Sequence, residues 1–155
     1  MKRNWKNFLI ALAIPLAVGG LSALLAGGMQ DYLQFRQPPL SPPGWVFPIV
    51  WSILYLMMGY ASYRIYTAQV PVKDKRQALI IYSIQLFLNF LWSPVFFGLK
   101  MYLAAFILLL ALWFFVFRTM RNFYAIDKTA GNLLIPYILW LSFAAYLNLG
   151  VYFLN

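Results

Sequence analysis

The sequence predicts an all-α integral membrane protein, a single bundle of five transmembrane helices. Of its 155 residues, 64% are apolar and only 10% are charged, whereas a soluble domain carries about 25% charged residues. Five apolar stretches are long enough to cross a bilayer core of about 30 Å, which takes about 20 helical residues. The segments between them are short, so residues 1–155 are expected to form a single domain.

The first span is expected at residues 8–27, directly after the basic residues Lys2, Arg3 and Lys6. A signal peptide also begins with a basic segment, but its apolar region is only about 7 to 15 residues long. A membrane span is therefore the favoured interpretation.

Small residues recur at every fourth position of this span, at Gly19, Ala23 and Gly27. This spacing lets helix backbones approach closely in lipid. We expect this face to pack inside the bundle, and the alternative is that it binds another membrane protein.

The loop at residues 28–44 is expected to form a stiff lid. Its two Pro-Pro pairs fix φ at about −65° and lack N–H donors, so they cannot continue a helix. The second span, 45–67, follows at once, and Pro48 falls in its first turn, where the N–H is not needed. A rigid lid beside a membrane helix suggests a pocket beneath it.

The remaining spans are expected at residues 77–97, 101–121 and 133–154. Polar segments at 68–76 and 122–132 and a short break at 98–100 separate them. No internal repeat is visible, which disfavours an inverted-repeat transporter.

Positive charge is unevenly distributed between the two ends of these spans. Of 12 Lys and Arg residues, all but Arg36 and Lys100 fall on the amino-terminal side. Short loops rich in Lys and Arg stay in the cytoplasm, so we expect a cytoplasmic amino terminus, with the first loop and the carboxyl terminus outside. The net charge of +9 then reflects orientation and attraction to anionic membrane lipid, and no nucleic-acid partner is expected.

Polar and aromatic residues follow one face of three spans. The stripes are Trp51, Tyr55, Gly59 and Ser62; Tyr82, Gln85, Asn89 and Trp92; and Tyr137, Trp140, Ala144 and Asn148. Amides inside a membrane are unfavourable unless they are hydrogen-bonded, so these stripes should face one another or a cavity. Any one amide could simply join two helices, but the amides, indoles and lid together favour a ligand cavity.

Most catalytic chemistry lacks its residues. The chain has no Cys and no His, and its three carboxylates, Asp31, Asp74 and Asp127, lie in predicted loops. Thiol catalysis, Ser-His-Asp hydrolysis, haem ligation by imidazole and a zinc site are therefore not expected. Proton-coupled transporters usually carry a carboxylate or histidine within their spans, and the predicted spans contain neither. The remaining function class is recognition of a planar apolar ligand, and we expect no obligatory cofactor and no metal.

Three motifs resemble one known family. They are Pro-Pro-x-Trp-Val-Phe-Pro-x-Val-Trp-Ser-x-Leu-Tyr at 42–55, Tyr-x-x-Gln-Leu-x-Leu-Asn-x-x-Trp-Ser-x-x-Phe-Phe at 82–97 and Pro-Tyr-x-Leu-Trp-x-x-Phe-Ala-x-x-Leu-Asn at 136–148. In this order they resemble the tryptophan-rich sensory protein / translocator protein family, whose mitochondrial members are also called peripheral benzodiazepine receptors. The resemblance spans nearly the whole chain.

The resemblance implies a homodimer that binds porphyrins such as protoporphyrin IX, and drug-like aromatic ligands, in a pocket open toward the first loop. The residues that match the family's ligand-binding positions are Tyr32, Pro42, Phe47, Pro48, Trp51, Gln85, Asn89, Trp140, Ala144 and Leu147. Among them, Trp51 matches the position that hydrogen-bonds a ligand carbonyl. Trp51 and Trp140 also match the pair proposed to act in light- and oxygen-dependent degradation of protoporphyrin, and are the candidate catalytic residues.

The chain departs from the family pattern at two places. Asp31-Tyr32 stands where members commonly have Trp-Tyr, and the segment 149–155 contains Val151 and Tyr152 without the basic residue of the animal sterol motif. Sterol binding through that motif is therefore not expected. The basic start also differs from the amphipathic, Arg-rich leader of a mitochondrial precursor, which favours a bacterial cell membrane.

Three functions are compatible with these observations. The first is a membrane receptor, sensor or carrier for porphyrins and other planar apolar molecules. The second is an enzyme-like photo-oxidative degradation of protoporphyrin. The third is a structural or assembly partner without a small-molecule ligand.

Overall fold

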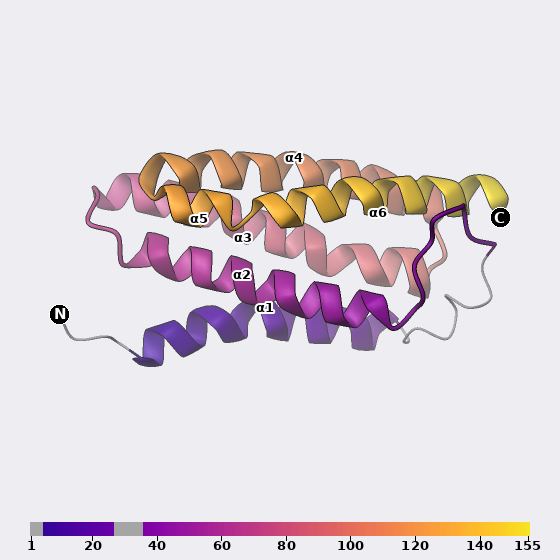
Figure 1. Cartoon of the computed structure of the whole chain (residues 1–155), viewed down its shortest axis with the longest axis horizontal. Coiled ribbons are helices and arrows are strands. Elements are labelled where there is room, and N and C mark those ends of the chain that lie inside the picture. Colours follow the sequence, from indigo (N-terminus) through magenta and orange to yellow (C-terminus); the bar gives the residue numbers. More distant parts are fainter. Residues whose placement is uncertain (1–4, 27–35) are drawn as a thin grey trace.

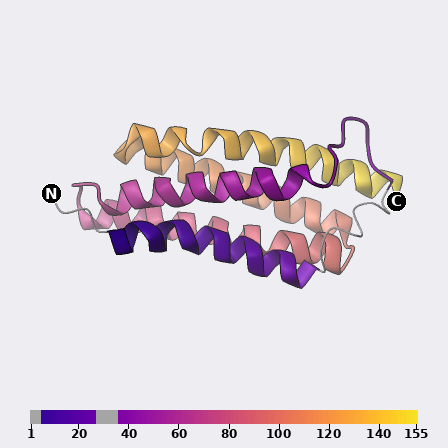
Figure 2. The same cartoon turned by 60° about the horizontal axis from the view of Figure 1, so that its bottom comes forward.

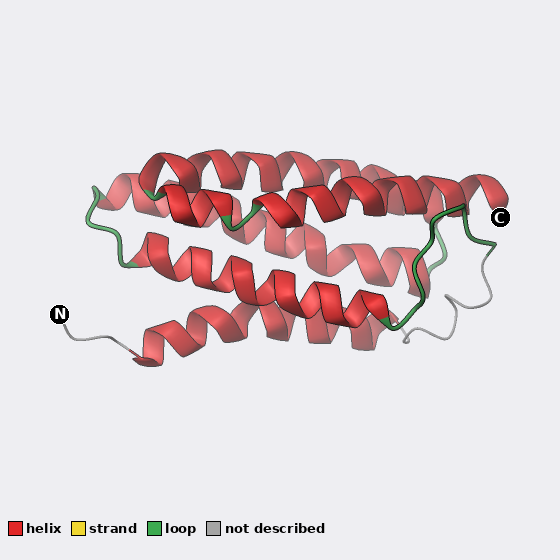
Figure 3. Cartoon of the chain, in the orientation of Figure 1, coloured by secondary structure: helices red, strands yellow, loops and turns green. Residues whose placement is uncertain are grey.

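The computed structural model of the chain describes residues 5–26 and 36–155. These residues form long helices that lie side by side along one axis (Figure 1). In chain order they are α1 (Trp5–Ala26), α2 (Val46–Tyr66), α3 (Val72–Ser93), the π-helical turn η2 (Pro94–Gly98), α4 (Tyr102–Ile126), α5 (Lys128–Asn132) and α6 (Ile135–Leu154). Short loops join them, and the described part of the chain contains no strand (Figure 3).

Five segments of the described chain are long and apolar enough to span a membrane. They are Trp5–Ala26, Val46–Tyr66, Val72–Gly98, Tyr102–Ile126 and Lys128–Leu154. The predicted all-α bundle of five membrane-spanning helices is confirmed, and the protein is an integral membrane protein. Its outward surface carries many large apolar side chains, such as Leu24 and Phe87, as expected for helices that face lipid.

The third and fourth spans are longer than the sequence suggested. α3 begins at Val72, so Lys73 to Arg76 are helical, and α4 continues to Ile126. Pro71 occupies the N-cap position with φ −53° and ψ 140°, and Asp74 lies in the first turn. A carboxylate is favourable there because the helix dipole is positive at its N-terminus, which explains why the charged segment joins the helix.

The predicted break between the third and fourth spans is present, and Pro94 causes it. Proline has no N–H to donate to the carbonyl of Phe90, four residues earlier. Ser22 of α1 supplies a donor instead, because its Oγ lies 2.8 Å from the Phe90 carbonyl oxygen. Beyond Pro94 the chain widens into η2 and then turns at Lys100, which has a φ of 55°. Ser22 thereby links α1 to the end of α3.

The helices pack in a closed ring. α1 lies against α2 and α3, α3 against α4, and α4 against α5 and α6 (Figures 1 and 2). Between α2 and α6 the ring is closed by aromatic side chains, since the rings of Trp51 and Tyr137 lie 6.1 Å apart. The buried residues of the described chain are mostly apolar, and the buried polar ones are Ser22, Ser62, Gln85, Asn89, Thr119 and Asn148.

Small residues let α1 approach α2. A Cβ added at Gly59 would lie 2.6 Å from the carbonyl oxygen of Ala11, and one added at Gly19 would overlap the ring of Tyr55. The prediction that the small-residue face of the first helix packs inside the bundle is therefore confirmed at Gly19, whereas Ala23 is exposed. Gly27 lies outside the described residues.

An ion pair joins α2 to the start of α5. The Nε of Arg64 lies 3.0 Å from Oδ2 of Asp127, and the backbone N–H of Ala130 donates to Oδ1 of the same carboxylate at 3.1 Å. Burial raises the pKa of the Asp127 carboxyl, but the hydrogen bonds from Ala130 and Arg64 outweigh it and hold that pKa below its usual 3.8. Asp127 is therefore both the N-cap of α5 and the partner of Arg64.

Replacing Asp127 with alanine is expected to lower the free energy of unfolding by about 1–2 kcal/mol at pH 7, because both the cap and a partly exposed ion pair are lost. The folded-state pKa is lower than the unfolded one, so the carboxylate stabilises the fold above about pH 4, and this contribution disappears as the pH falls through the folded-state value. Thermal unfolding in detergent at pH 7 and pH 3 would measure both effects. Asp127→Asn keeps a capping oxygen and should lose only the ion-pair part; equal destabilisation by alanine at both pH values would contradict this account.

Candidate ligand-binding cavity

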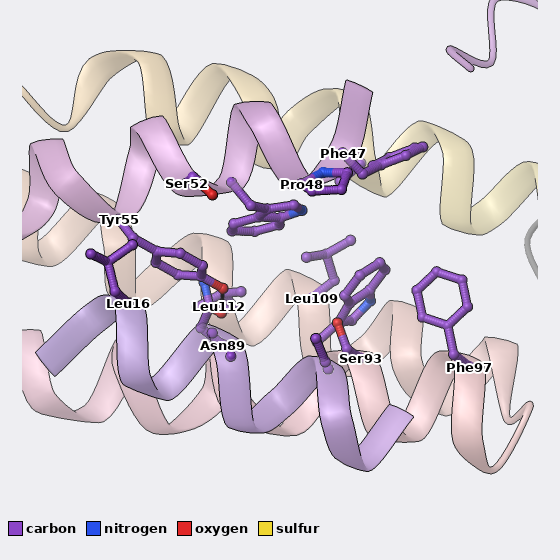
Figure 4. Close-up of a pocket in the computed structure, with 16 residues that line it drawn as sticks. Leu16, Phe47, Pro48, Ser52, Tyr55, Asn89, Ser93, Phe97, Leu109 and Leu112 are labelled. Carbon is purple, nitrogen blue, oxygen red and sulfur yellow. Dashed lines mark hydrogen bonds between the residues drawn. The ribbon is translucent and has the colours of Figure 1, made fainter. Parts of the chain in front are cut away.

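An apolar cavity of about 290 Å³ lies between α1, α2 and α3 (Figure 4). Its lining residues come from every long helix and from η2: Leu16, Gly19, Gly20, Ala23, Phe47, Pro48, Trp51, Ser52, Tyr55, Asn89, Trp92, Ser93, Phe97, Leu109, Leu112 and Ala144. None of these described residues is charged. The cavity can therefore hold an apolar molecule and offer it a few neutral hydrogen-bonding groups.

Trp51 is the centre of the aromatic wall. Its ring stacks on Tyr55 at a centroid distance of 5.5 Å and an interplanar angle of 28°. On its other side it meets Trp140 edge to face at 6.5 Å and 88°, and Phe47 meets Trp140 at 5.7 Å. Aromatic pairs in these geometries hold one another in position, so Trp51 presents a fixed surface to the cavity.

A buried hydrogen-bond network fixes the polar part of the cavity wall. The hydroxyl of Tyr55 donates to Oδ1 of Asn89 at 2.9 Å, and Nδ2 of Asn89 donates to the hydroxyl of Tyr137 at 2.6 Å. Tyr137 in turn donates to Oε1 of Gln85 at 2.8 Å, and Nε2 of Gln85 lies 3.9 Å from the sulfur of Met58. Each amide uses one donor and one acceptor in this network, which leaves Asn89 a second N–H and a second lone pair for a ligand.

Gly59 of the second-span stripe packs against α1 instead. The three stripes face one another at Tyr55, Asn89 and Tyr137, as predicted. A second amide contact supports this, because Nε1 of Trp92 donates to Oδ1 of Asn148 at 2.9 Å. Asn148 donates from Nδ2 to the backbone carbonyl of Tyr102 at 2.9 Å. The indole of Trp92 also stacks on Phe96 at 5.1 Å, which holds it against the cavity.

Five of the residues predicted to bind ligand line this cavity. They are Phe47, Pro48, Trp51, Asn89 and Ala144. Gln85, with 1% of its surface exposed, lies behind Asn89 and serves the network instead. Leu147 is also buried and does not reach the cavity wall. Tyr32 lies outside the described residues.

Trp140 lies behind Trp51 and not on the cavity wall. It lines an outer groove between α2 and α6 together with Val50, Ile53 and Phe143. Its Nε1 is buried and has no hydrogen-bond partner among the described residues. The two predicted pocket indoles are thus in contact, but only Trp51 faces the cavity.

The described part of the predicted lid, residues 36–44, is attached to α6. The hydroxyl of Tyr146 donates to the carbonyl of Pro39 at 2.6 Å, and Pro38 is buried beside Gly150. Asn155 closes the attachment through both the N–H and the carbonyl of Arg36. These residues, Pro42 among them, arch over one end of the bundle (Figure 2) but do not line the cavity. A proline-rich segment has few backbone donors, so side chains of α6 bind its carbonyls instead.

The sequence prediction of the site missed the contribution of α1. Leu16, Gly19, Gly20 and Ala23 form one wall of the cavity. Glycine and alanine at this spacing indicate close packing, and nothing in their chemistry points to a ligand. Tyr55 and Trp92 lie on predicted stripes, and the structure adds both to the cavity wall.

Comparison with known proteins identifies the family that carries the three sequence motifs at 42–55, 82–97 and 136–148. A family model described as the TspO/MBR family matches residues 11–154. The chain belongs to this family. The tryptophan-rich sensory protein of Cereibacter sphaeroides is 37% identical over 155 residues, which cover 100% of this chain and 95% of that protein. The tryptophan-rich protein TspO of Chlorobaculum tepidum is 39% identical over 157 residues, covering 100% and 99%.

The similarity extends to animal members of the TspO/MBR family. The translocator protein of Homo sapiens is 35% identical over 126 residues, which cover 81% of this chain and 75% of that protein. The protein is therefore a membrane protein of the tryptophan-rich sensory and translocator type. The cavity beside Trp51 lies within the part of the chain that the family model matches.

Proposed function

We propose that the protein is a membrane receptor or carrier that binds porphyrins, such as protoporphyrin IX, and other planar aromatic molecules in the cavity beside Trp51. The observation that supports this most is the aromatic wall of Trp51, Tyr55 and Trp92 around an uncharged interior. Indole and phenol rings offer stacking surfaces to a planar ring. The spare N–H and lone pair of Asn89 give such a ligand an orientation.

The size of the cavity also bears on the ligand. At about 290 Å³ it lies near the lower end of the range of small-molecule pockets, about 300–1,000 Å³. A porphyrin would place one edge beside Trp51 and extend past Gly20, whose Cα has open space where a side chain would stand. Its carboxylates would then remain outside the uncharged interior, where burial would be unfavourable.

Titration of purified protein with protoporphyrin IX, followed by tryptophan fluorescence, tests the proposal. We expect saturable binding with a Kd of about 1 μM or lower, and Trp51→Phe should weaken it at least about fivefold, or about 1 kcal/mol, because a smaller stacking surface remains. The matched control is Trp113→Phe. That indole is on α4, stacks on Phe117 at 5.6 Å and does not line the cavity.

The comparison uses the fitted Kd and not the quenching amplitude, because each variant removes one fluorophore. Unchanged affinity in Trp113→Phe with weakened affinity in Trp51→Phe would support the cavity as the site. Linear quenching without saturation, equal in all three proteins, would show that porphyrin only partitions into detergent and would refute the proposal.

Degradation of protoporphyrin by Trp51 and Trp140 has less support. The two indoles are 6.5 Å apart, but only Trp51 lines the cavity. A ligand there would contact Trp51 directly and Trp140 only through it. Binding is therefore the function that the geometry favours.

We also propose that the basic end of the bundle faces the cytoplasm of a bacterial cell. Lys6, Arg64, Lys73, Arg118 and Lys128 lie near helix ends that the antiparallel packing brings to the same side. Clusters of this kind in short loops are retained in the cytoplasm. The cavity beside Trp51 then lies toward the outer side.

A further inference from the structure

Two arginines lie on the lipid-facing side of α4. The outward stripe of this helix consists of large apolar side chains that are 44% to 60% exposed: Leu103, Ile107, Leu110 and Phe114. Arg118 and Arg121 continue the same stripe, at the spacing of three or four residues that keeps side chains on one face of a helix, and both are exposed. The stripe therefore passes from apolar side chains to a pair of cations without leaving the surface that lipid covers.

Each guanidinium lies over an aromatic ring one turn earlier in α4. The Cζ of Arg118 is 6.0 Å from the ring centroid of Phe114, and that of Arg121 is 5.9 Å from the centroid of Phe117. Trp113 stacks on Phe117 at 5.6 Å and is hydrogen-bonded to α6 through its Nε1. A ring covers one face of a guanidinium and leaves the N–H donors at its edge unused.

Neither guanidinium has an anionic partner in the described chain. Among the described residues the only ion pair joins Arg64 to Asp127, so Asp74 on the neighbouring α3 forms none with Arg118 or Arg121. The two arginines also make no hydrogen bond to a described residue, and their contacts are those with the two rings. An unpaired cation at the edge of a membrane is unfavourable, so an anion from outside the chain would stabilise the pair.

Distance along α4 indicates which anion can reach the two arginines. The helix begins at Tyr102, and Lys100 just before it is an exposed cation that marks the headgroups of the opposite leaflet. At 1.5 Å per residue, Arg118 lies about 24 Å and Arg121 about 28 Å from Tyr102. The hydrocarbon core is about 30 Å thick, so both arginines lie at its edge at the basic end of the bundle. Their long side chains can reach the lipid phosphates at that level.

We propose that Arg118 and Arg121 bind one anionic phospholipid of the leaflet at the basic end, with its phosphate between the two guanidiniums and an acyl chain along the apolar stripe. Arginine suits a phosphate because it donates two parallel N–H bonds to it. A zwitterionic lipid such as phosphatidylcholine carries an ammonium group beside its phosphate, and that cation would approach the second arginine. Phosphatidylglycerol has a neutral glycerol in that place, so the pair should favour the anionic lipid.

Two lipids that differ only in the headgroup test the proposal. Purified protein in an uncharged maltoside detergent is titrated with phosphatidylglycerol or with phosphatidylcholine of the same acyl chains, and bound lipid is measured by native mass spectrometry. Wild-type protein should bind the first phosphatidylglycerol about fivefold more tightly than the first phosphatidylcholine. The double variant Arg118→Gln, Arg121→Gln should bind the two lipids equally.

The matched control is the double variant Lys73→Gln, Arg76→Gln. It removes two charges of the same sign and spacing, at the same end of the bundle, from the exposed start of α3, and leaves α4 unchanged. It should keep most of the preference for phosphatidylglycerol. An equal loss of preference in both double variants would show that the lipid responds only to net charge, and would overturn the proposal. Absence of a preference in wild type would overturn it as well.

A third double variant separates charge from geometry. Arg118→Lys, Arg121→Lys keeps both charges but loses the planar fork that binds phosphate, so it should bind phosphatidylglycerol at least about twofold more weakly than wild type. Wild-type affinity in this variant would contradict the proposed contact. All three variants change exposed side chains and should unfold at the wild-type temperature without lipid. Neither arginine lines the cavity beside Trp51, so the result is independent of the porphyrin titration.

Discussion

Replacing Asn89 with leucine is expected to lower the free energy of unfolding by about 2–4 kcal/mol. Asn89 is 4% exposed and joins three helices, because it accepts from Tyr55 of α2 and donates to Tyr137 of α6. Leucine keeps the branched shape of the side chain, with methyl groups in place of the amide, but makes neither bond. The Tyr55 hydroxyl is then a buried donor without an acceptor, and Tyr137 loses one of its two partners.

A double-mutant cycle separates this network from simple packing. Tyr55→Phe alone should cost about 1 kcal/mol, and the Tyr55→Phe, Asn89→Leu pair should be less destabilised than the sum of the single variants, because no unpaired phenol remains beside the leucine. Unfolding in detergent, followed by circular dichroism, measures all three. Additive effects would show that Tyr55 and Asn89 are not coupled.

Asn89→Leu also tests whether the hydrogen-bond network affects porphyrin binding as well as stability. Trp51 stacks on Tyr55, so loss of the Asn89 bond frees the ring that positions the indole. Porphyrin affinity of Asn89→Leu should therefore fall at least as much as that of Tyr55→Phe. Unchanged affinity in both would limit the network to a structural role.

The fold could be predicted from sequence because the membrane leaves few alternatives. Every backbone polar group must be satisfied within the bilayer, so long apolar stretches become helices. The helix ends are less predictable where charged residues adjoin an apolar span. Residues 73–76 have the composition of a turn, but Pro71 caps α3 just before them and Asp74 lies in its first turn. Charged residues can extend a helix beyond the apolar region, and composition alone does not mark where that helix starts.

The candidate site was predictable where polar side chains follow a helical spacing. Asn89, Trp51 and Tyr137 are conspicuous in apolar spans, and the structure brings them together. Which of them face the cavity depends on rotations of the helices that spacing does not specify. Gln85 therefore lies behind Asn89, while the wall from α1 consists of small residues without any polar signal.

Replacing Gly59 with alanine is expected to make the protein about 2 kcal/mol less stable than the matched variant Gly20→Ala. Alanine has the higher helix propensity by about 1 kcal/mol at either position, so propensity cancels in the comparison. The two positions differ in the space available to the added methyl group. A Cβ at Gly59 would lie 2.6 Å from the carbonyl oxygen of Ala11 and 2.9 Å from the Cα of Leu12, whereas a Cβ at Gly20 meets nothing within 4 Å.

The atoms opposite Gly59 belong to the backbone of α1, which cannot turn aside as a side chain could, so the whole helix must move away from α2. Because α1 forms one wall of the cavity beside Trp51, that shift should also weaken porphyrin binding there. Unfolding of both variants, and porphyrin titration of Gly59→Ala against wild type, distinguish this outcome from a local effect. Equal stability of the two alanine variants would mean that α1 adjusts its position without cost, and the close approach at Gly59 would then not be what holds α1 in place.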